Sequence, residues 1–145
     1  ADRHGLRNFV IRPKGAWEHQ GHVEFTLASD HPAGNKVVGS GDPDDDGVGR
    51  TGERIRIPVE RLDHVLEAES IERVRLVSVT TNGTELTVLK GLGQRFSACD
   101  AISVARAWSK PNVRQLLEEE GFSNVARDDR GITFVRAAVL AHADS

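Results

Sequence analysis

The chain has 145 residues, a usual length for a single domain, and 38% of them are apolar, which is enough for a hydrophobic core. It carries 19 basic and 22 acidic residues, a formal net charge of −3, and no long basic stripe. This balance argues against nucleic-acid binding through phosphate contacts. No run of about 18 apolar residues occurs, so no membrane span is expected.

The compartment is predicted from the N-terminus and from cysteine usage. Residues 1–4 carry charge but are not followed by the apolar stretch of a secretory signal peptide. Cys99 is the only cysteine, so no disulfide forms within the chain, and its neighbours Phe96 and Ile102 predict a buried thiol. These features predict a cytoplasmic protein.

Short strands are predicted in the first part of the chain. Residues 8–12 read as a strand that ends at Pro13, and residues 15–17 are predicted to be a turn. In residues 22–27 apolar and polar side chains alternate, which predicts a strand with one buried face.

A long acidic loop is predicted over residues 29–53, because glycine, aspartate, proline and serine dominate there. Five of its residues have the spacing of a calcium-binding loop, namely Asp42, Asp44, Asp46, Gly47 and Glu53. The loop lies between predicted strands, whereas such loops lie between helices, and Arg50 stands at a ligand position. We therefore expect a solvated loop and no metal site, with calcium binding as the alternative.

Strands and helices alternate after this loop. Residues 54–59 predict an edge strand, and apolar residues at helical spacing predict a short helix over residues 59–68. Residues 74–80 are the most strand-like run and predict a central strand buried on both faces. The remaining expected elements are a helix ending near Gly91 or Gly93, a strand over 101–107, a helix from Pro111 to Gly121, and strands over 123–126 and 131–137. This order predicts an α/β protein with a mostly parallel sheet and an antiparallel hairpin at one edge.

Ligands of open α/β sheets bind at the carboxyl ends of the strands, here residues 13–17, 80–85 and 107–110. Trp17 and Trp108 stand at two of these ends, where a tryptophan either faces a flat ring such as adenine or covers the core. The residues alone favour packing against the core.

Residues 80–85 also allow two interpretations. Their hydroxyl, amide and carboxylate groups are suited to a binding site. Alternatively they cap the following helix, with Thr81 or Asn82 as the N-cap and Glu85 near the third helical position. Spacing alone favours the capping interpretation.

Two stretches carry a known pattern: Arg61-Leu62-Asp63-His64-Val65-Leu66, and Val77-Ser78-Val79-Thr80-Thr81-Asn82-Gly83-Thr84-Glu85-Leu86-Thr87-Val88-Leu89-Lys90-Gly91. They resemble the T-L-D-x-L and K-I-D-V-E-G-x-E-x-x-V-L-K-G-A motifs of the FkbM methyltransferase family. Residues 115–122 are similar to that family's L-L-x-x-x-G-[FY] ending. The resemblance covers most of the chain.

The resemblance implies a Rossmann-like methyltransferase fold, a three-layer sandwich, present as a partial domain over residues 1–145. It also implies S-adenosylmethionine as cofactor and methyl transfer, most simply to a hydroxyl group of a sugar, glycan, lipid or small metabolite. The family's glycine-rich turn and ribose-binding acidic residue have no counterpart in this sequence, so we expect an incomplete C-terminal part, truncated at the N-terminus.

The resemblance further implies site residues, which are Thr80, Asn82 and Glu85 for catalysis and Gly15, Ala16 and Trp17 for cofactor binding. Thr80 and Asn82 stand where the family has aspartate and glutamate. Because neither side chain titrates near neutral pH, both are expected to form hydrogen bonds and not to act as general bases. A non-catalytic remnant or binding module on the same fold is the alternative function.

Overall fold

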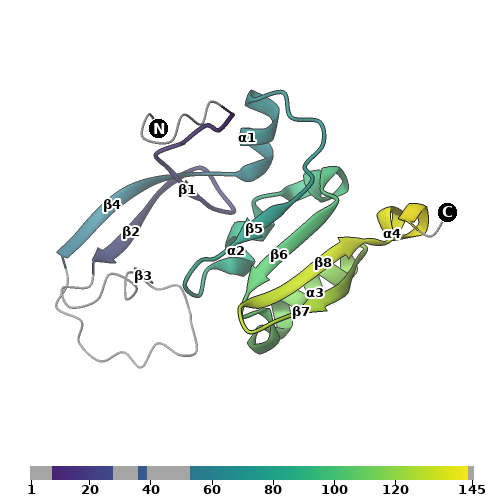
Figure 1. The fold of residues 1–145 in the computed structure, drawn as a ribbon. Coiled ribbons are helices and arrows are strands. Elements are labelled where there is room, and N and C mark those ends of the chain that lie inside the picture. The colour runs from purple at the N-terminus through teal and green to yellow at the C-terminus, as the bar shows by residue number, and fades with distance from the viewer. Residues whose placement is uncertain (1–7, 28–35, 39–52, 144–145) are drawn as a thin grey trace.

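The computed structural model describes residues 8–27, 36–38 and 53–143. These residues form two four-stranded sheets, one in each half of the chain. Figure 1 shows the N-terminal sheet at the upper left and the C-terminal sheet at the lower right.

The N-terminal sheet contains, in order across the sheet, β1 (Gly15–Ala16), β4 (Glu53–Glu60), β2 (Gly21–Leu27) and β3 (Lys36–Val37). Strands β2 and β4 are antiparallel, with Val23 opposite Ile57 and Phe25 opposite Ile55, so their apolar side chains share one face. These four residues are only half-buried, whereas Val59 is buried. The predicted strand over residues 22–27 is confirmed.

The segment before β1 differs from the prediction. Residues 8–12 are not a strand: Val10 and Ile11 are 72% and 73% exposed, and no strand pairs with them in the described part of the chain. Strand propensity without a pairing partner does not form a strand. The turn predicted at residues 15–17 instead contains β1, which lies parallel to the end of β4.

Strand β4 is paired differently along its length. It pairs with β2 from Glu53 to Val59 and with β1 at Val59 and Glu60. The strand thus lies between β1 and β2, and the predicted edge position is wrong for the strand as a whole. Among the described residues, 53–58 have a neighbouring strand on one side only, which suits Pro58, a residue without an N–H to donate. Helix α1 (Leu62–Ala68) begins later than predicted, because Val59 and Glu60 complete β4. The predicted acidic loop lies outside the described residues except for β3, Val38 and Glu53.

The C-terminal sheet contains, in order, β5 (Val77–Val79), β6 (Ala101–Ala105), β8 (Gly131–Arg136) and β7 (Phe122–Arg127). Strands β5 and β6 are parallel, whereas β8 is antiparallel to both β6 and β7. The predicted hairpin at one edge is confirmed. The mostly parallel sheet is not, because both sheets are mixed and rich in antiparallel pairs.

The prediction of a central strand over residues 74–80 is wrong. Strand β5 has three residues and lies at an edge of the sheet. Only one of its faces is buried: Val79 is 3% exposed, whereas Ser78 and Thr80 on the other face are exposed. The composition of the run indicated burial, but its place depends on pairing with distant segments, and β8 takes the other side of β6.

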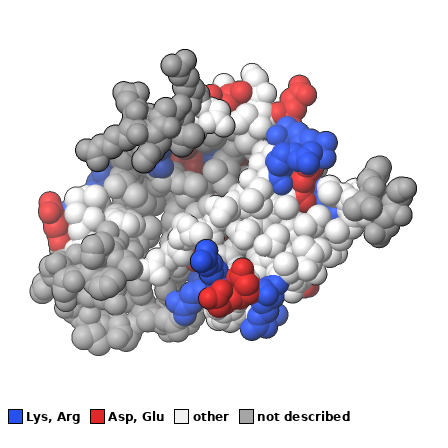
Figure 2. All heavy atoms as spheres, in the orientation of Figure 1, with Lys and Arg blue, Asp and Glu red and all other residues white. Residues whose placement is uncertain are grey.

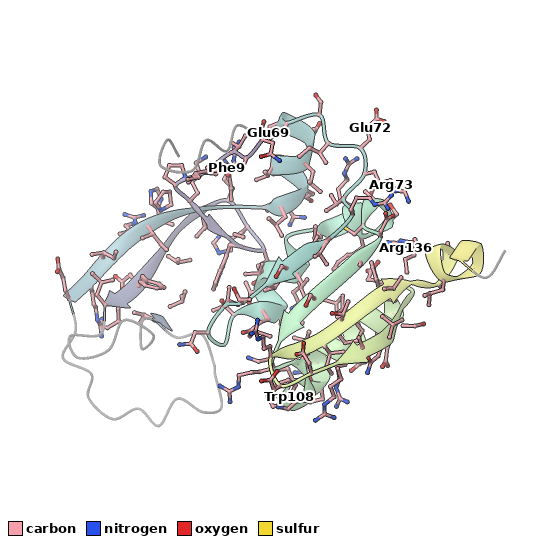
Figure 3. The ribbon with its side chains drawn as sticks, in the orientation of Figure 1. Phe9, Glu69, Glu72, Arg73, Trp108 and Arg136 are labelled. Atoms are coloured by element: carbon pink, nitrogen blue, oxygen red, sulfur yellow. The ribbon has the colours of Figure 1, made fainter. Side chains whose placement is uncertain are left out.

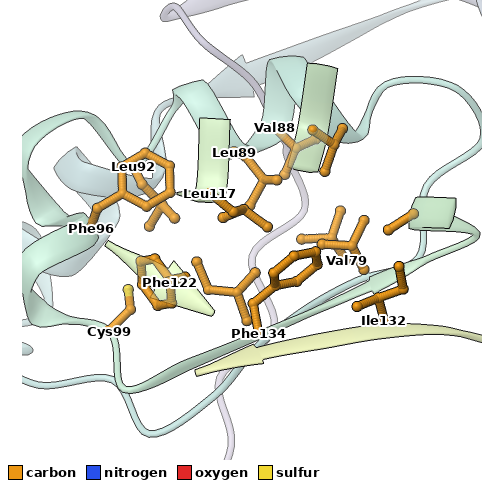
Figure 4. Packing of buried hydrophobic residues seen from close by; sticks show 14 residues of the cluster. Val79, Val88, Leu89, Leu92, Phe96, Cys99, Leu117, Phe122, Ile132 and Phe134 are labelled. Carbon is orange, nitrogen blue, oxygen red and sulfur yellow. The ribbon is translucent and has the colours of Figure 1, made fainter. Parts of the chain in front are cut away.

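Three helical segments cover one face of this sheet: α2 (Glu85–Lys90), the 3-10 helix η3 (Gly93–Ala98) and α3 (Pro111–Glu119). Their side chains Leu89, Phe96 and Leu117 meet Ile102 and Phe134 of the strands, and all five are at most 3% exposed (Figure 4). A three-layer sandwich, with helices on both faces, is not confirmed in the described part of the chain. The main core is this single sheet–helix interface.

Local signals at the helix ends agree with the structure. α2 ends just before Gly91, and α3 begins at Pro111 and is followed by Gly121 in the left-handed conformation, with φ of 82°. The 3-10 helix η4 (Ala107–Ser109) and the C-terminal helix α4 (Ala137–Ala143) were not predicted. None of the described helices has the length and apolar character needed to cross a membrane.

The predicted buried thiol is confirmed. Cys99 is fully buried in the core, and this burial raises the pKa of its thiol. It lies at the end of the C-terminal sheet opposite Trp108, where Arg136 donates a hydrogen bond of 2.9 Å to the Cys99 carbonyl (Figure 3).

Candidate functional site

The turn between β5 and α2 presents the predicted catalytic residues. Thr80 and Asn82 are exposed, and Gly83 has a φ of 88°, which favours glycine. Helix α2 begins with Thr84 as its N-cap residue and Glu85 as its first helical residue. The capping interpretation, in which Thr81 or Asn82 is the N-cap, is therefore wrong.

Glu85 is the charged centre of this turn. Its residue is only 2% exposed, and one carboxylate oxygen accepts a hydrogen bond of 2.6 Å from Lys110 Nζ. The other oxygen accepts a weaker bond of 3.3 Å from the Gly83 N–H. A buried carboxylate requires such partners, because burial without them is costly. Glu85 therefore holds the turn in place and is not itself open to solvent.

Lys110 was not predicted as a functional residue. It directly precedes α3, and its ammonium group reaches back 25 residues in sequence to Glu85. The pair therefore ties the carboxyl end of β5 to the segment after β6. The only sequence signal was the position of Lys110 just beyond Trp108, in the predicted strand-end segment.

Trp108 lies at the same end of the sheet (Figure 3). It is half-buried and packs against the core, as the packing interpretation predicts. The guanidinium carbon of Arg127 lies 5.5 Å from the centroid of its ring.

The predicted cofactor residues lie elsewhere around α2. Ala16 packs against the core, and the backbone N–H of Trp17 donates a 2.9 Å hydrogen bond to the backbone carbonyl of Glu60. A Cβ placed on Gly91 would lie only 2.3 Å from the Trp17 carbonyl oxygen, so this loop touches the C-terminal end of α2. Thr80 and Asn82 lie toward the opposite end of this helix, whose length is about 9 Å at 1.5 Å per residue. The structure thus brings the two predicted groups to opposite ends of one short helix.

No metal centre is found in the described part of the chain, where no group of three or more histidine, cysteine or acidic residues could hold an ion. The calcium-like spacing noted in the acidic loop lies outside the described residues except for Glu53. The prediction that the loop is solvated and metal-free stays a prediction.

Residues 3–123 match the family model of the methyltransferase FkbM domain. The chain belongs to the FkbM methyltransferase family. The match extends from before β1 to the start of β7, so it contains both predicted groups of site residues. No curated protein and no solved structure matches the chain.

The residues that this FkbM domain shares with the family motif have structural roles. Val88 and Leu89 are buried in the core, and Gly91 allows the close approach of Trp17. The Gly91 carbonyl also accepts a 2.9 Å hydrogen bond from the N–H of Asp63, so the two motif stretches meet at the end of α2. Thr80 and Asn82, where the chain departs from the family pattern, are exposed, and so is Lys90, which matches the pattern.

Proposed function

We propose that this FkbM domain takes part in methyl transfer from S-adenosylmethionine to a hydroxyl group of a small acceptor, at the carboxyl ends of β5 and β6. The observation that supports this most is the exposed turn at Thr80 and Asn82, held by the pair of Lys110 with Glu85, a buried residue of the family motif. A rigid support beneath exposed polar groups is what a positioning site requires.

Methyl transfer places modest demands on the side chains. The sulfonium of S-adenosylmethionine supplies an activated methyl group, so the protein mainly orients the reactants and excludes water. Thr80 and Asn82 do this by hydrogen bonds to the acceptor or to the cofactor, since neither titrates near neutral pH. Glu85 acts through them by keeping the turn in place, and Gly83 supplies the left-handed conformation that the turn needs.

The part of Trp17 that is available to a cofactor is its ring. Its backbone N–H donates to the backbone carbonyl of Glu60, and its backbone carbonyl is packed on Gly91. The half-buried ring contacts His19 edge-on, with centroids 6.4 Å apart. Trp17 therefore suits the flat adenine ring better than the polar parts of S-adenosylmethionine. Gly15 and Ala16 place the tryptophan at the end of β1.

The alternative is a binding module without catalytic activity. It is favoured by Thr80 and Asn82, which replace the acidic residues of the family motif and leave the turn without a titrating group that is open to solvent. The two functions differ in whether the chain recognises S-adenosylmethionine at these residues.

The test is a titration of S-adenosylmethionine into the isotope-labelled chain, followed by amide NMR shifts. Weak binding, with a Kd of about 1 mM, corresponds to a binding free energy of about −4 kcal/mol and remains detectable in this way. We expect shifts at residues 16–17 and 80–83, and their reduction in Asn82→Ala and Asn82→Asp but not in the matched exposed variant Asn124→Ala. An absence of shifts, or shifts confined to other residues, would support the binding module.

A further inference from the structure

A cavity of about 310 Å³ opens on the face of the C-terminal sheet that α2, η3 and α3 do not cover. Its floor carries the hydroxyl groups of Ser78, Ser103 and Thr133 on three adjacent strands, and that of Thr80 just after β5. The pairing register sets Ser78 beside Ser103 and Ser103 beside Thr133, so the hydroxyls form a row across the sheet. Thr133 donates a 3.4 Å hydrogen bond to Ser103, which is long and leaves both groups able to bind another partner.

The rim of this hydroxyl cavity is charged. Arg127 at the end of β7 and Asp128 and Arg130 of the β7–β8 turn line it, and Figure 2 shows basic and acidic side chains gathered at that end of the sheet. One oxygen of Asp128 accepts hydrogen bonds from the N–H groups of Arg130 and Gly131, at 2.8 and 2.9 Å. These bonds lower the pKa of Asp128 and commit that oxygen to the turn.

One arginine of the rim, Arg130, is placed to meet a ligand. Arg127 pairs across the hairpin with the core residue Ile132, and its guanidinium carbon lies 5.5 Å from the centroid of the Trp108 ring, so its side chain lies on the helix-covered face. Guanidinium groups bind carboxylates and phosphates through paired charge-assisted hydrogen bonds. The rim therefore suits an anionic group.

The lining also argues against a lipid tail. Its apolar side chains are those of Ala105 and Ala126, which are too small to surround an alkyl chain. Sites for apolar ligands are lined mainly by large hydrophobic and aromatic side chains. Hydroxyl groups on the floor instead match the hydroxyl groups of a polyol, each of which both donates and accepts hydrogen bonds.

We propose that the hydroxyl cavity binds the methyl acceptor, and that this acceptor is a small polyhydroxylated molecule carrying a carboxylate or a phosphate. The inference rests on the proposed function in one respect: Thr80 belongs both to the cavity and to the proposed catalytic turn. The polyol lies along the hydroxyl row, and its anionic group lies at Arg130. A hydroxyl of the acceptor is thereby brought next to Thr80.

The test uses four probes, glucose 6-phosphate, glucuronate, glucose and octyl glucoside, each titrated into the labelled chain and followed by amide NMR shifts. We expect the first two probes to shift the amides of Ser103, Arg130 and Thr133, with affinities that fall as salt is added. The phosphate and the carboxylate probe separate the two kinds of anion. Glucose is expected to bind at least about tenfold more weakly, a difference of about 1.4 kcal/mol.

Variants separate the roles of floor and rim. Arg130→Gln should weaken the acidic probes about tenfold, whereas Arg127→Gln, which changes the opposite face of the sheet, should have little effect. Arg114→Gln, an exposed arginine on the outer side of α3, is the matched control and should change nothing. Thr133→Val, which keeps the shape of the side chain, should weaken all bound polyols by a smaller factor, and melting curves verify that each variant is folded.

Several results would overturn the proposal: equal binding of glucose and the acidic probes, preferred binding of octyl glucoside, shifts at other residues, or no binding. These outcomes are separate from those of the cofactor titration. If acidic polyols bind but S-adenosylmethionine does not, the cavity is a polyol site and the proposed methyl transfer is wrong. If S-adenosylmethionine binds but acidic polyols do not, the proposed function stands and only the proposed class of acceptor is wrong.

Discussion

The two sheets of this chain are stabilised by different kinds of contact. The C-terminal sheet holds nearly all of the buried apolar side chains, and its cluster includes Ile102, Leu117 and Phe134 at 0% exposure. The N-terminal sheet contributes a single fully buried apolar residue among those described, Val59, and its apolar face is otherwise half-buried.

Polar contacts hold the N-terminal part of the chain together. Arg12 and Lys14 bind the Glu60 carboxylate at 2.7 and 3.0 Å, and Arg61 donates a 2.8 Å hydrogen bond to the Glu18 carbonyl. Such contacts fix geometry but add less stability than apolar burial. The comparison therefore indicates a stable C-terminal body that carries the Thr80–Asn82 turn, and a less stable sheet that carries Trp17.

The largest contrast is expected from one substitution made in each sheet. Phe134→Ala empties a fully buried position and should lower the free energy of unfolding by about 3–5 kcal/mol. Phe25→Ala, the matched change on the half-buried face of β2, should cost clearly less. Chemical denaturation of both variants measures the difference. Equal losses would mean that the N-terminal sheet is as well packed as the C-terminal one.

The contact between the two regions is tested at Gly91. Its φ of −64° suits alanine, but the added Cβ would lie 2.3 Å from the Trp17 carbonyl oxygen. We expect Gly91→Ala to cost about 1–3 kcal/mol through overpacking, despite the better helix propensity of alanine. The amide shifts of β1 should move as well.

Gly121→Ala is the control for this substitution. No atom lies within 4 Å of the position of its Cβ, so any cost arises from its φ of 82° and should leave β1 unchanged. A stabilising Gly91→Ala would contradict the close approach of Trp17.

The support beneath the proposed site is tested at Lys110. Lys110→Met leaves the carboxylate of Glu85 buried without its charged partner, which should cost about 1–3 kcal/mol. Lys90→Met removes an exposed ion pair with Glu18, 3.9 Å long, and should cost less than about 0.5 kcal/mol. Thermal melts compare the two variants, and partial recovery in Lys110→Arg would show that the positive charge is what matters. If both methionine variants melt alike, Glu85 does not depend on Lys110.

The smallest expected effect is the acid response of Glu60. Hydrogen bonds from Arg12 and Lys14 lower the pKa of this carboxyl to about 2 from an ordinary value of about 4.5. Its contribution to stability is therefore complete above about pH 4.5 and is lost as the pH falls toward about 2. Glu60→Gln should flatten the stability profile in this window and leave its shape near neutral pH unchanged. An equally steep profile in the variant would assign the acid response to other carboxyls.

The sequence predicts best those elements that local residues determine. Pro111 and Gly121 mark the ends of α3, and the turn at residues 128–131 joins the hairpin strands, because each feature restricts the backbone where it stands. The alternation in residues 22–27 likewise predicts β2 with its buried face.

Features that depend on distant segments could not be predicted in this way. The edge position of β5 is decided by the pairing of β6 with β8, and β1 exists only because Gly15 and Ala16 lie beside the end of β4. The partner of Glu85 is also distant in sequence. The motif identified Glu85, but only the folded chain shows that Lys110 holds it.

Native-state hydrogen exchange tests the central claim most directly. If the C-terminal sheet is the stable body that carries the site, amides of β6 and β8 will exchange only through global unfolding, whereas those of β2 and β4 will exchange faster through local opening. The Gly83 N–H, which is bonded to Glu85, should lose protection in Lys110→Met. Equal protection of the two sheets, or stronger protection of β2 and β4, would contradict the account.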